Sequence, residues 1–241
     1  MRALVFGAVA ASLMASSAIA ATVNAVVNIA PPGTQSAGAA NNRAVTVSRF
    51  DPSLGTLTQI DFTLDSTVDG FIQYEITGTS GGDVSVELGA DASLTFLGLE
   101  FLSTNAAFST TDFGKSGFDG VQDFAGASGN AYLGIVENDT DMRTVTAGMG
   151  IGFVVGQDIL NQFTGVGAVN GFIPNSANTS ATGPGSILQE FETNYTPALT
   201  VVYTFAPPPP PDGEIPLPAA LPLLATALGG FGFMSWRKRR A

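Results

Sequence analysis

The sequence predicts an all-β protein: an antiparallel β-sandwich, jelly-roll or Greek-key-like, followed by one C-terminal transmembrane helix. Three observations predict it. Apolar and polar residues alternate with a period of two through much of the chain. Asp-Gly, Gly-Gly and Gly-Pro-Gly steps punctuate these segments as turns do. An uncharged apolar run then stands near the C-terminus.

Residues 1–21 have the features of a secretory signal peptide. Arg2 precedes a short apolar stretch, and small residues follow with an A-x-A site at Ala18 and Ala20. We therefore expect cleavage after Ala20 or Ala21. The alternative is an uncleaved N-terminal anchor, but the apolar stretch is short for crossing a bilayer.

The predicted sandwich domain spans residues 22–205. The alternating segments expected as strands are 60–65, 72–76, 84–88, 94–101, 149–153 and 199–205. The expected turns are Asp69-Gly70, Ser80-Gly81-Gly82-Asp83, Gly89-Ala90-Asp91 and Gly183-Pro184-Gly185. The polar stretch 175–186 is expected to be a mobile loop, and QDILNQF at 157–163 is the best candidate for a short helix.

Composition excludes several classes of function. The chain has no Cys and no His, which removes disulfides, cysteine nucleophiles, histidine-based zinc sites and the Ser-His-Asp triad. Residues 22–213 hold 19 of the 20 Asp and Glu but only four of the nine Lys and Arg. Such a negative surface repels nucleic acid, which is excluded as a partner. Lys115 lies in a Gly-Lys-Ser step that lacks the rest of a phosphate loop, and no enzyme is predicted.

Oxygen-bearing side chains remain the only candidates for a ligand site. Four of them fall within five residues of VENDTDM, namely Glu137, Asn138, Asp139 and Asp141. Ca²⁺ takes oxygen ligands of this kind, so the segment is a candidate calcium site, and no other cofactor is predicted. The alternative is a solvated acidic turn between strands. Asp119 and Asp123 are expected to make turns.

The C-terminal region predicts a spacer and then an anchor. Five consecutive prolines in the linker 206–214 favour a stiff polyproline II spacer. Residues 215–241 form the sorting and anchor segment, in which a helix over 219–236 would be about 27 Å long, close to a bilayer's hydrocarbon thickness. A buried core helix is the alternative. The basic residues that close the chain predict a stop-transfer signal held in the cytoplasm, and they are Arg237, Lys238, Arg239 and Arg240.

These C-terminal features resemble the PEP-CTERM class of bacterial sorting signals. The motif residues are Ile215, Pro216, Leu217, Pro218 and Ala219. They resemble the VPLPA-CTERM variant, with Ile in place of Val at the first position. The resemblance implies a Gram-negative host, export through the secretion translocon and recognition by an exosortase-type membrane protease. The protein would be anchored in the inner membrane at least transiently, and would then pass to the cell surface or extracellular matrix.

A second resemblance lies in the body of the chain. The stretches that carry it are FDPSLGTL at 50–57, FDG at 118–120, DFAGASG at 123–129, FTG at 163–165 and LTVVYTF at 199–205. In this order they resemble the choice-of-anchor E domain family. The resemblance implies an extracellular β-rich domain with alternative surface anchors, and it brings no catalytic residues.

Together these observations predict an exported, surface-anchored or surface-sorted protein without enzymatic activity. By resemblance, its role is structural, in an exopolysaccharide matrix or biofilm. The alternative is an extracellular module that binds a glycan or Ca²⁺ through its loops. A carboxylate-dependent hydrolase is the third hypothesis, because acidic side chains are plentiful although no pair stands out.

Overall fold

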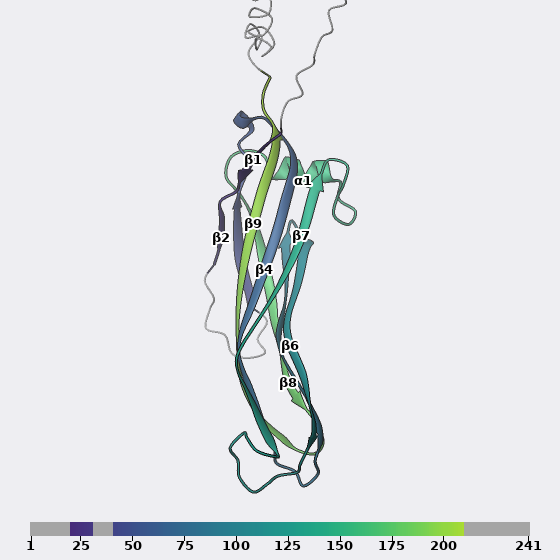
Figure 1. Ribbon diagram of the computed structural model, residues 1–241. Coiled ribbons are helices and arrows are strands. Elements are labelled where there is room, and N and C mark those ends of the chain that lie inside the picture. The colour runs from purple at the N-terminus through teal and green to yellow at the C-terminus, as the bar shows by residue number, and fades with distance from the viewer. Residues whose placement is uncertain (1–19, 31–40, 210–241) are drawn as a thin grey trace, which may run out of the picture. The chain divides into compact units, whose positions relative to one another are not determined.

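The computed structural model describes residues 20–30 and 41–209 (Figure 1). The sorting motif, the predicted transmembrane segment, the basic tail and Ala18 lie outside the described residues, so their predictions stay predictions. Within the described ranges no helix is both long and apolar enough to cross a membrane. The chain divides into two units, Met1–Pro207 and Pro208–Ala241, and every described strand belongs to the first.

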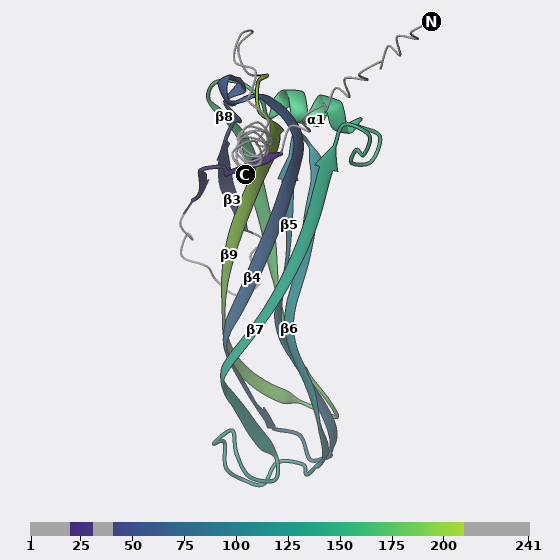
Figure 2. The ribbon, with the colours of Figure 1, turned by 45° about the horizontal axis from the view of Figure 1, so that its top comes forward.

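Two antiparallel sheets pack face to face and confirm the predicted all-β sandwich (Figures 1 and 2). The four-stranded sheet has the order β1 (Ala21–Asn24), β9 (Ile187–Ala206), β4 (Thr56–Ile76) and β7 (Gly129–Thr146). The five-stranded sheet has the order β2 (Val27–Ile29), β3 (Asn41–Ser48), β8 (Ala168–Thr182), β5 (Gly82–Phe96) and β6 (Leu99–Lys115). At about 3.3 Å per residue, the 21 residues of β4 extend roughly 70 Å, so the long strands run the length of the sandwich.

A cluster of aromatic rings in the core lies toward the end of the sandwich where β9 finishes. The Phe62 ring lies 5.0 Å from that of Phe101 and 5.5 Å from that of Phe163, centroid to centroid. Phe163 follows α1 (Gly156–Gln162), which lies across this end in Figure 2 and confirms the short helix predicted at 157–163. Ile159 and Leu160 are fully buried, so the helix covers the end of the core.

A tight corner connects β3 to β4 at the same end. The Asp51 side chain accepts a hydrogen bond from the Ser53 N–H (2.8 Å) and caps the 3-10 helix Pro52–Leu54. Gly55 follows with φ of 143°, and a Cβ there would lie 2.1 Å from the Ala206 carbonyl oxygen. Only glycine therefore allows the end of β9 to pass so closely.

Two of the expected turns are wrong, because both lie inside long strands. Asp69-Gly70 lies within β4, which stays paired with β9 throughout this region. A Cβ on Gly70 would lie 1.9 Å from the Glu192 carbonyl oxygen. Glycine is therefore needed here because the backbone of β9 passes close to it, and not because the chain turns. Gly89-Ala90-Asp91 likewise lies within β5.

Two segment predictions also fail. The alternation at 149–153 makes only isolated bridges and no strand. The expected mobile loop at 175–186 is the second half of β8, which continues to Thr182 and leaves a turn only at 183–186. Most side chains in this half of β8 are small and polar, so the sequence shows no alternation of apolar and polar residues from which a strand could be predicted.

Charged side chains close the two open sides of the sandwich. On one side the outermost strands are β6 and β7, and carboxylates of β7 reach the backbone of β6. Asp139 Oδ2 accepts from the Asn105 N–H (2.7 Å), and Asp141 Oδ2 accepts from the Ser103 N–H (2.9 Å). These bonds satisfy donors that an outermost strand would otherwise leave unpaired.

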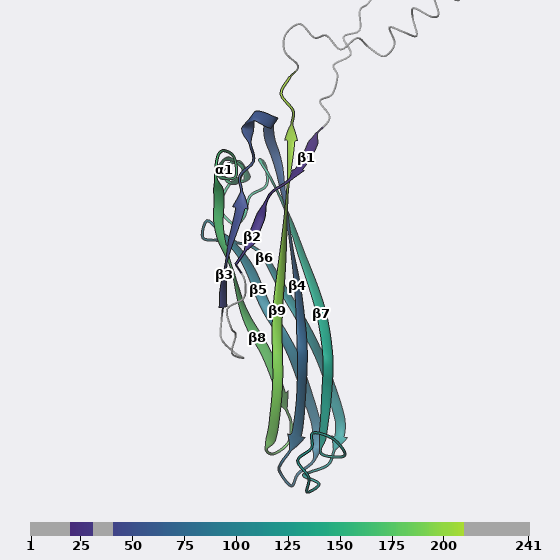
Figure 3. The same ribbon diagram turned by 90° about the vertical axis from the view of Figure 1, so that its left-hand side faces the viewer.

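The opposite side, which faces the viewer in Figure 3, carries a matching contact. Arg43 on β3 donates from Nη2 to the Tyr195 carbonyl oxygen on β9 (2.5 Å). Its guanidinium also lies 5.7 Å from the centre of the Tyr195 ring, at cation–π distance. Arg43 is only 7% exposed, so this ionic group is almost wholly inside the sandwich.

We expect Asp141→Ala to destabilise the protein by about 0.5–1.5 kcal/mol, the net contribution of one hydrogen bond, because the exposed Ser103 N–H loses its acceptor. Urea unfolding measures the loss, and hydrogen exchange should accelerate at the Ser103 amide more than elsewhere in β6. The control is Glu87→Ala, which removes an exposed carboxylate from the outer face of β5. Unchanged exchange at Ser103 would contradict the bridging role of Asp141.

Candidate functional site

A polar pocket of about 510 Å³ opens on the five-stranded sheet. It is lined by Asp91, Ala92, Ser93, Glu100, Ser103, Thr104, Asn105, Asp139, Pro174, Asn175 and Ser176. We call it the Pro174 pocket. Its volume falls in the range of small-ligand sites, and nine of its eleven lining residues have polar or charged side chains.

The pocket lies where the sheet is interrupted. Ala92 pairs with Asn175 across β5 and β8, and the next pair is Thr95 with Phe172. The missing pairs coincide with Pro174, which has no N–H to donate to a neighbouring strand. The pairing of β5 with β6 also shifts register at this level of β5. Irregular pairing on both sides of one strand therefore opens the surface.

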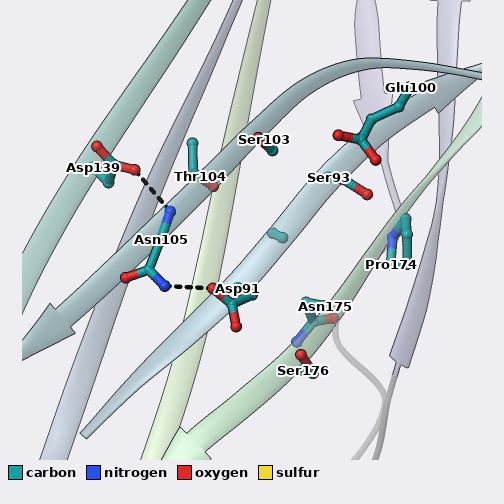
Figure 4. Close-up of a pocket in the computed structure, with 11 residues that line it drawn as sticks. Asp91, Ser93, Glu100, Ser103, Thr104, Asn105, Asp139, Pro174, Asn175 and Ser176 are labelled. Carbon is teal, nitrogen blue, oxygen red and sulfur yellow. Dashed lines mark hydrogen bonds between the residues drawn. The ribbon is translucent and has the colours of Figure 1, made fainter. Parts of the chain in front are cut away.

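The Asp91 carboxylate is held at the centre of the lining (Figure 4). One oxygen accepts from Asn105 Nδ2 (2.5 Å), and the other accepts from Asn178 Nδ2. The backbone N–H of Asn105 in turn donates to Asp139. The two amides come from β6 and β8, so three strands fix the orientation of this carboxylate without consuming all of its acceptor positions.

A buried acceptor without a partner also belongs to the lining. Asn175 is only 4% exposed, and its Oδ1 has no hydrogen-bond partner within the described part of the chain. A buried polar atom left unsatisfied costs about 1–3 kcal/mol. Its neighbours Pro174 and Ser176 occupy the outer face of β8, so the Asn175 side chain points to the inner face, as does that of its buried partner Ala92.

An exposed aromatic ring flanks the pocket. Phe172 precedes Pro174 by two residues on β8, so both occupy positions on the outer face of the strand. Phe172 is 54% exposed, which is high for such a large apolar side chain. It was not among the residues expected to form a site, because the sequence around it did not predict a strand.

The four residues of the calcium candidate lie on β7, not in a turn. Successive residues of a strand point to opposite faces, and Asn138 faces outward, where its side chain accepts from the Thr67 hydroxyl (2.7 Å). Asp139 and Asp141 accept backbone hydrogen bonds from β6. Among the described residues no group of three or more Asp and Glu side chains could hold a metal ion. Of the four, only Asp139 lines the Pro174 pocket, and Glu137 does not.

The loop between β6 and β7 uses its polar residues for structure. Lys115 Nζ donates to the carbonyl oxygens of Gly126 (3.0 Å) and Gly129 (2.6 Å), which ties the loop to the end of β6. Asp119 and Asp123 each accept from the N–H two residues later (3.0 Å in both), which confirms the turns expected there.

A second polar cluster joins three strands at the end of the sandwich that carries the loop between β6 and β7. Asp112 on β6 accepts from the hydroxyls of Tyr74 on β4 and Tyr132 on β7 (2.5 Å each) and from Asn130 Nδ2 (3.0 Å). Burial by itself would raise the pKa of Asp112, but these three hydrogen bonds and nearby Lys115 together lower it. Burial, with the bond to Asp112, raises the pKa of both tyrosines.

Neither a protein-family model nor a curated protein nor a solved structure matches the chain. The residues and geometry of the chain itself are therefore the basis for assigning a function.

We expect the free energy of unfolding of the wild-type protein to fall more steeply with decreasing pH than that of the Asp112→Asn variant. The folded pKa of Asp112 is lowered, so its ionised form stabilises the fold above its unfolded pKa, about 3.9, and that contribution disappears as the pH falls further. Urea midpoints measured from about pH 6 to about pH 2 test this. Glu87→Gln, which removes an exposed carboxylate of β5, should keep the wild-type slope. Parallel curves for wild type and Asp112→Asn would contradict the prediction.

Proposed function

We propose that the protein is an exported, non-enzymatic surface or matrix protein whose sandwich binds a polysaccharide in the Pro174 pocket. The observation that carries the proposal is the arrangement of Asp91. Its carboxylate is fixed between two amides, in a pocket whose strand β8 also carries the exposed ring of Phe172. Ordered acceptors, donors and one apolar platform together favour a polar ligand with an apolar face.

Sugars match this lining in both respects. Neighbouring hydroxyls of a sugar ring can donate to a carboxylate and accept from an amide, and Asp91 with Asn105 offers both groups. The opposite face of a sugar ring carries C–H bonds, which pack on the negatively charged face of an aromatic ring. Phe172 supplies such a ring on the same face of β8 as Pro174.

The same contacts favour binding over hydrolysis. A glycosidase needs one carboxyl group that is protonated and free to donate to the leaving oxygen. Asp91 accepts hydrogen bonds on both oxygens, and Asp139 accepts backbone bonds on both of its own. Glu100 is the remaining carboxylate of the lining. One uncommitted carboxylate supports no acid–base pair, so the hydrolase remains the weakest of the three hypotheses.

The ends of the sandwich domain support its display on a stalk. β1 begins at Ala21, so cleavage after Ala20 would leave this strand whole. β1 pairs with the end of β9, with Ala21 opposite Phe205, so the chain enters and leaves the domain on adjacent strands. All but two of the connections between consecutive strands pass from one sheet to the other, which supports the jelly-roll arrangement.

We expect the protein to bind matrix polysaccharide purified from its host, and Phe172→Ala to weaken binding about tenfold, because stacking on an aromatic ring contributes about 0.5–1.5 kcal/mol beyond buried area. Co-sedimentation at increasing polysaccharide concentration measures the affinity. Phe113→Ala is the matched control, since Phe113 is 78% exposed and follows Asn105 by eight residues on β6, about 26 Å away at about 3.3 Å per residue. Equal affinities for the two variants, or no binding by the wild type, would overturn the proposal.

The sorting part of the proposal has its own test. We expect the intact mass of the protein from its host to correspond to an N-terminus at Ala21 or Thr22 and a C-terminus between Ile215 and Ala219. A variant with Pro216→Ala and Pro218→Ala should instead stay full-length in the membrane fraction, because it lacks the recognised motif. Full-length wild-type protein confined to membranes would show that residues 219–236 are a permanent anchor.

A further inference from the structure

The lining of the Pro174 pocket is negatively charged. Three of its eleven residues are carboxylates, Asp91, Glu100 and Asp139, and none is Lys or Arg. Their charges lie at a pocket whose other side chains are neutral, so the local potential is negative. A ligand that carries anions would have to approach against this potential.

None of the four basic side chains of the sandwich lines the pocket, and three of them are bound elsewhere. The fourth, Arg143, is exposed on β7. Arg43 is buried and donates to the Tyr195 carbonyl oxygen. Arg49 donates to the Val166 carbonyl oxygen (3.4 Å), and Lys115 is bound to the loop between β6 and β7. These groups therefore do not neutralise the carboxylates of the pocket.

The pocket also has more acceptors than donors. Asp91 accepts two hydrogen bonds, although a carboxylate offers about four lone-pair positions. Glu100 is exposed at the rim of the lining. The missing component is a group with several N–H or O–H donors and a positive charge.

We infer that the Pro174 pocket selects amino-sugar polysaccharides, in which free ammonium groups meet these carboxylates. The inference rests on the proposed polysaccharide binding and adds the chemical class of the sugar. An ammonium group has three donors and no acceptor, which complements the Asp91 and Glu100 carboxylates. The Phe172 ring adds a surface on which a cationic sugar is favoured over a neutral one. Glycans rich in uronic acid are rejected by charge.

Three oligosaccharides that differ mainly in charge test the inference with the full-length protein. They are hexamers of glucosamine, of N-acetylglucosamine and of galacturonic acid, titrated calorimetrically at about pH 5.5, where the Asp and Glu side chains remain ionised. The glucosamine hexamer should bind at least about tenfold more tightly than the N-acetylated one at about 50 mM salt, and the ratio should shrink at about 500 mM. The galacturonate hexamer should not bind.

Matched variants locate the selectivity. Asp91→Asn and Glu100→Gln should each lower the preference for the glucosamine hexamer about threefold to tenfold, since each removes one charge of the lining. Glu87→Gln makes the same change of charge on the outer face of β5, outside the pocket, and should leave the preference intact. An equal loss with Glu87→Gln would mean diffuse attraction to an acidic surface and would overturn the inference.

The outcomes separate this inference from the proposed function. Equal affinity for the glucosamine and N-acetylglucosamine hexamers, with loss of both in Phe172→Ala, would overturn the amino-sugar selectivity and leave polysaccharide binding standing. Binding of the galacturonate hexamer would likewise overturn the selectivity. Failure of every hexamer and of host polysaccharide to bind would remove the proposed function itself.

Discussion

The structure depends on how an unclosed sandwich satisfies the backbone at its open sides. A barrel pairs every strand, but two stacked sheets leave outer strands with free N–H and C=O groups. Here Asp139 and Asp141 accept the N–H groups of β6, and Arg43 donates to a carbonyl of β9. Each contact joins one sheet to the other, so the groups that protect the strands also fix how the two sheets are aligned. A slip of one residue in β7 would turn both carboxylates away from β6.

Polar side chains that join the two sheets also meet in the middle of the sandwich. Ser66, Thr104 and Tyr195 share buried hydroxyl contacts, and Arg43 lies over the Tyr195 ring. Thr104 and Asp139 also line the Pro174 pocket, so the pocket is continuous with this interior polar layer. A layer of this kind tolerates an interruption of the sheet by Pro174, because the exposed groups can be hydrated or bound by a ligand.

Period-two alternation was sufficient to predict the sandwich and several strands, but not the lengths of the strands. Asp69-Gly70 has the composition of a turn, yet Gly70 is required because the Glu192 carbonyl approaches from the neighbouring strand. A local sequence pattern does not indicate which residue, more than a hundred positions away, will lie beside it in the fold. The candidate site was missed for the same reason. Asp91, Asn105 and Asn178 are unremarkable in sequence and acquire a role only because three strands bring them together.

The five stretches FDPSLGTL, FDG, DFAGASG, FTG and LTVVYTF lie toward the ends of the sandwich and not at the pocket. Phe50 donates its N–H to the Phe163 carbonyl (2.8 Å) and accepts from the Gly165 N–H (2.9 Å), so FDPSLGTL and FTG form one contact. Gly129 packs closely against the backbone of Phe124 and Ala125 at the opposite end. No residue of these stretches lines the Pro174 pocket. Changes of the pocket residues would therefore leave the end contacts untouched, and one scaffold could carry different binding specificities.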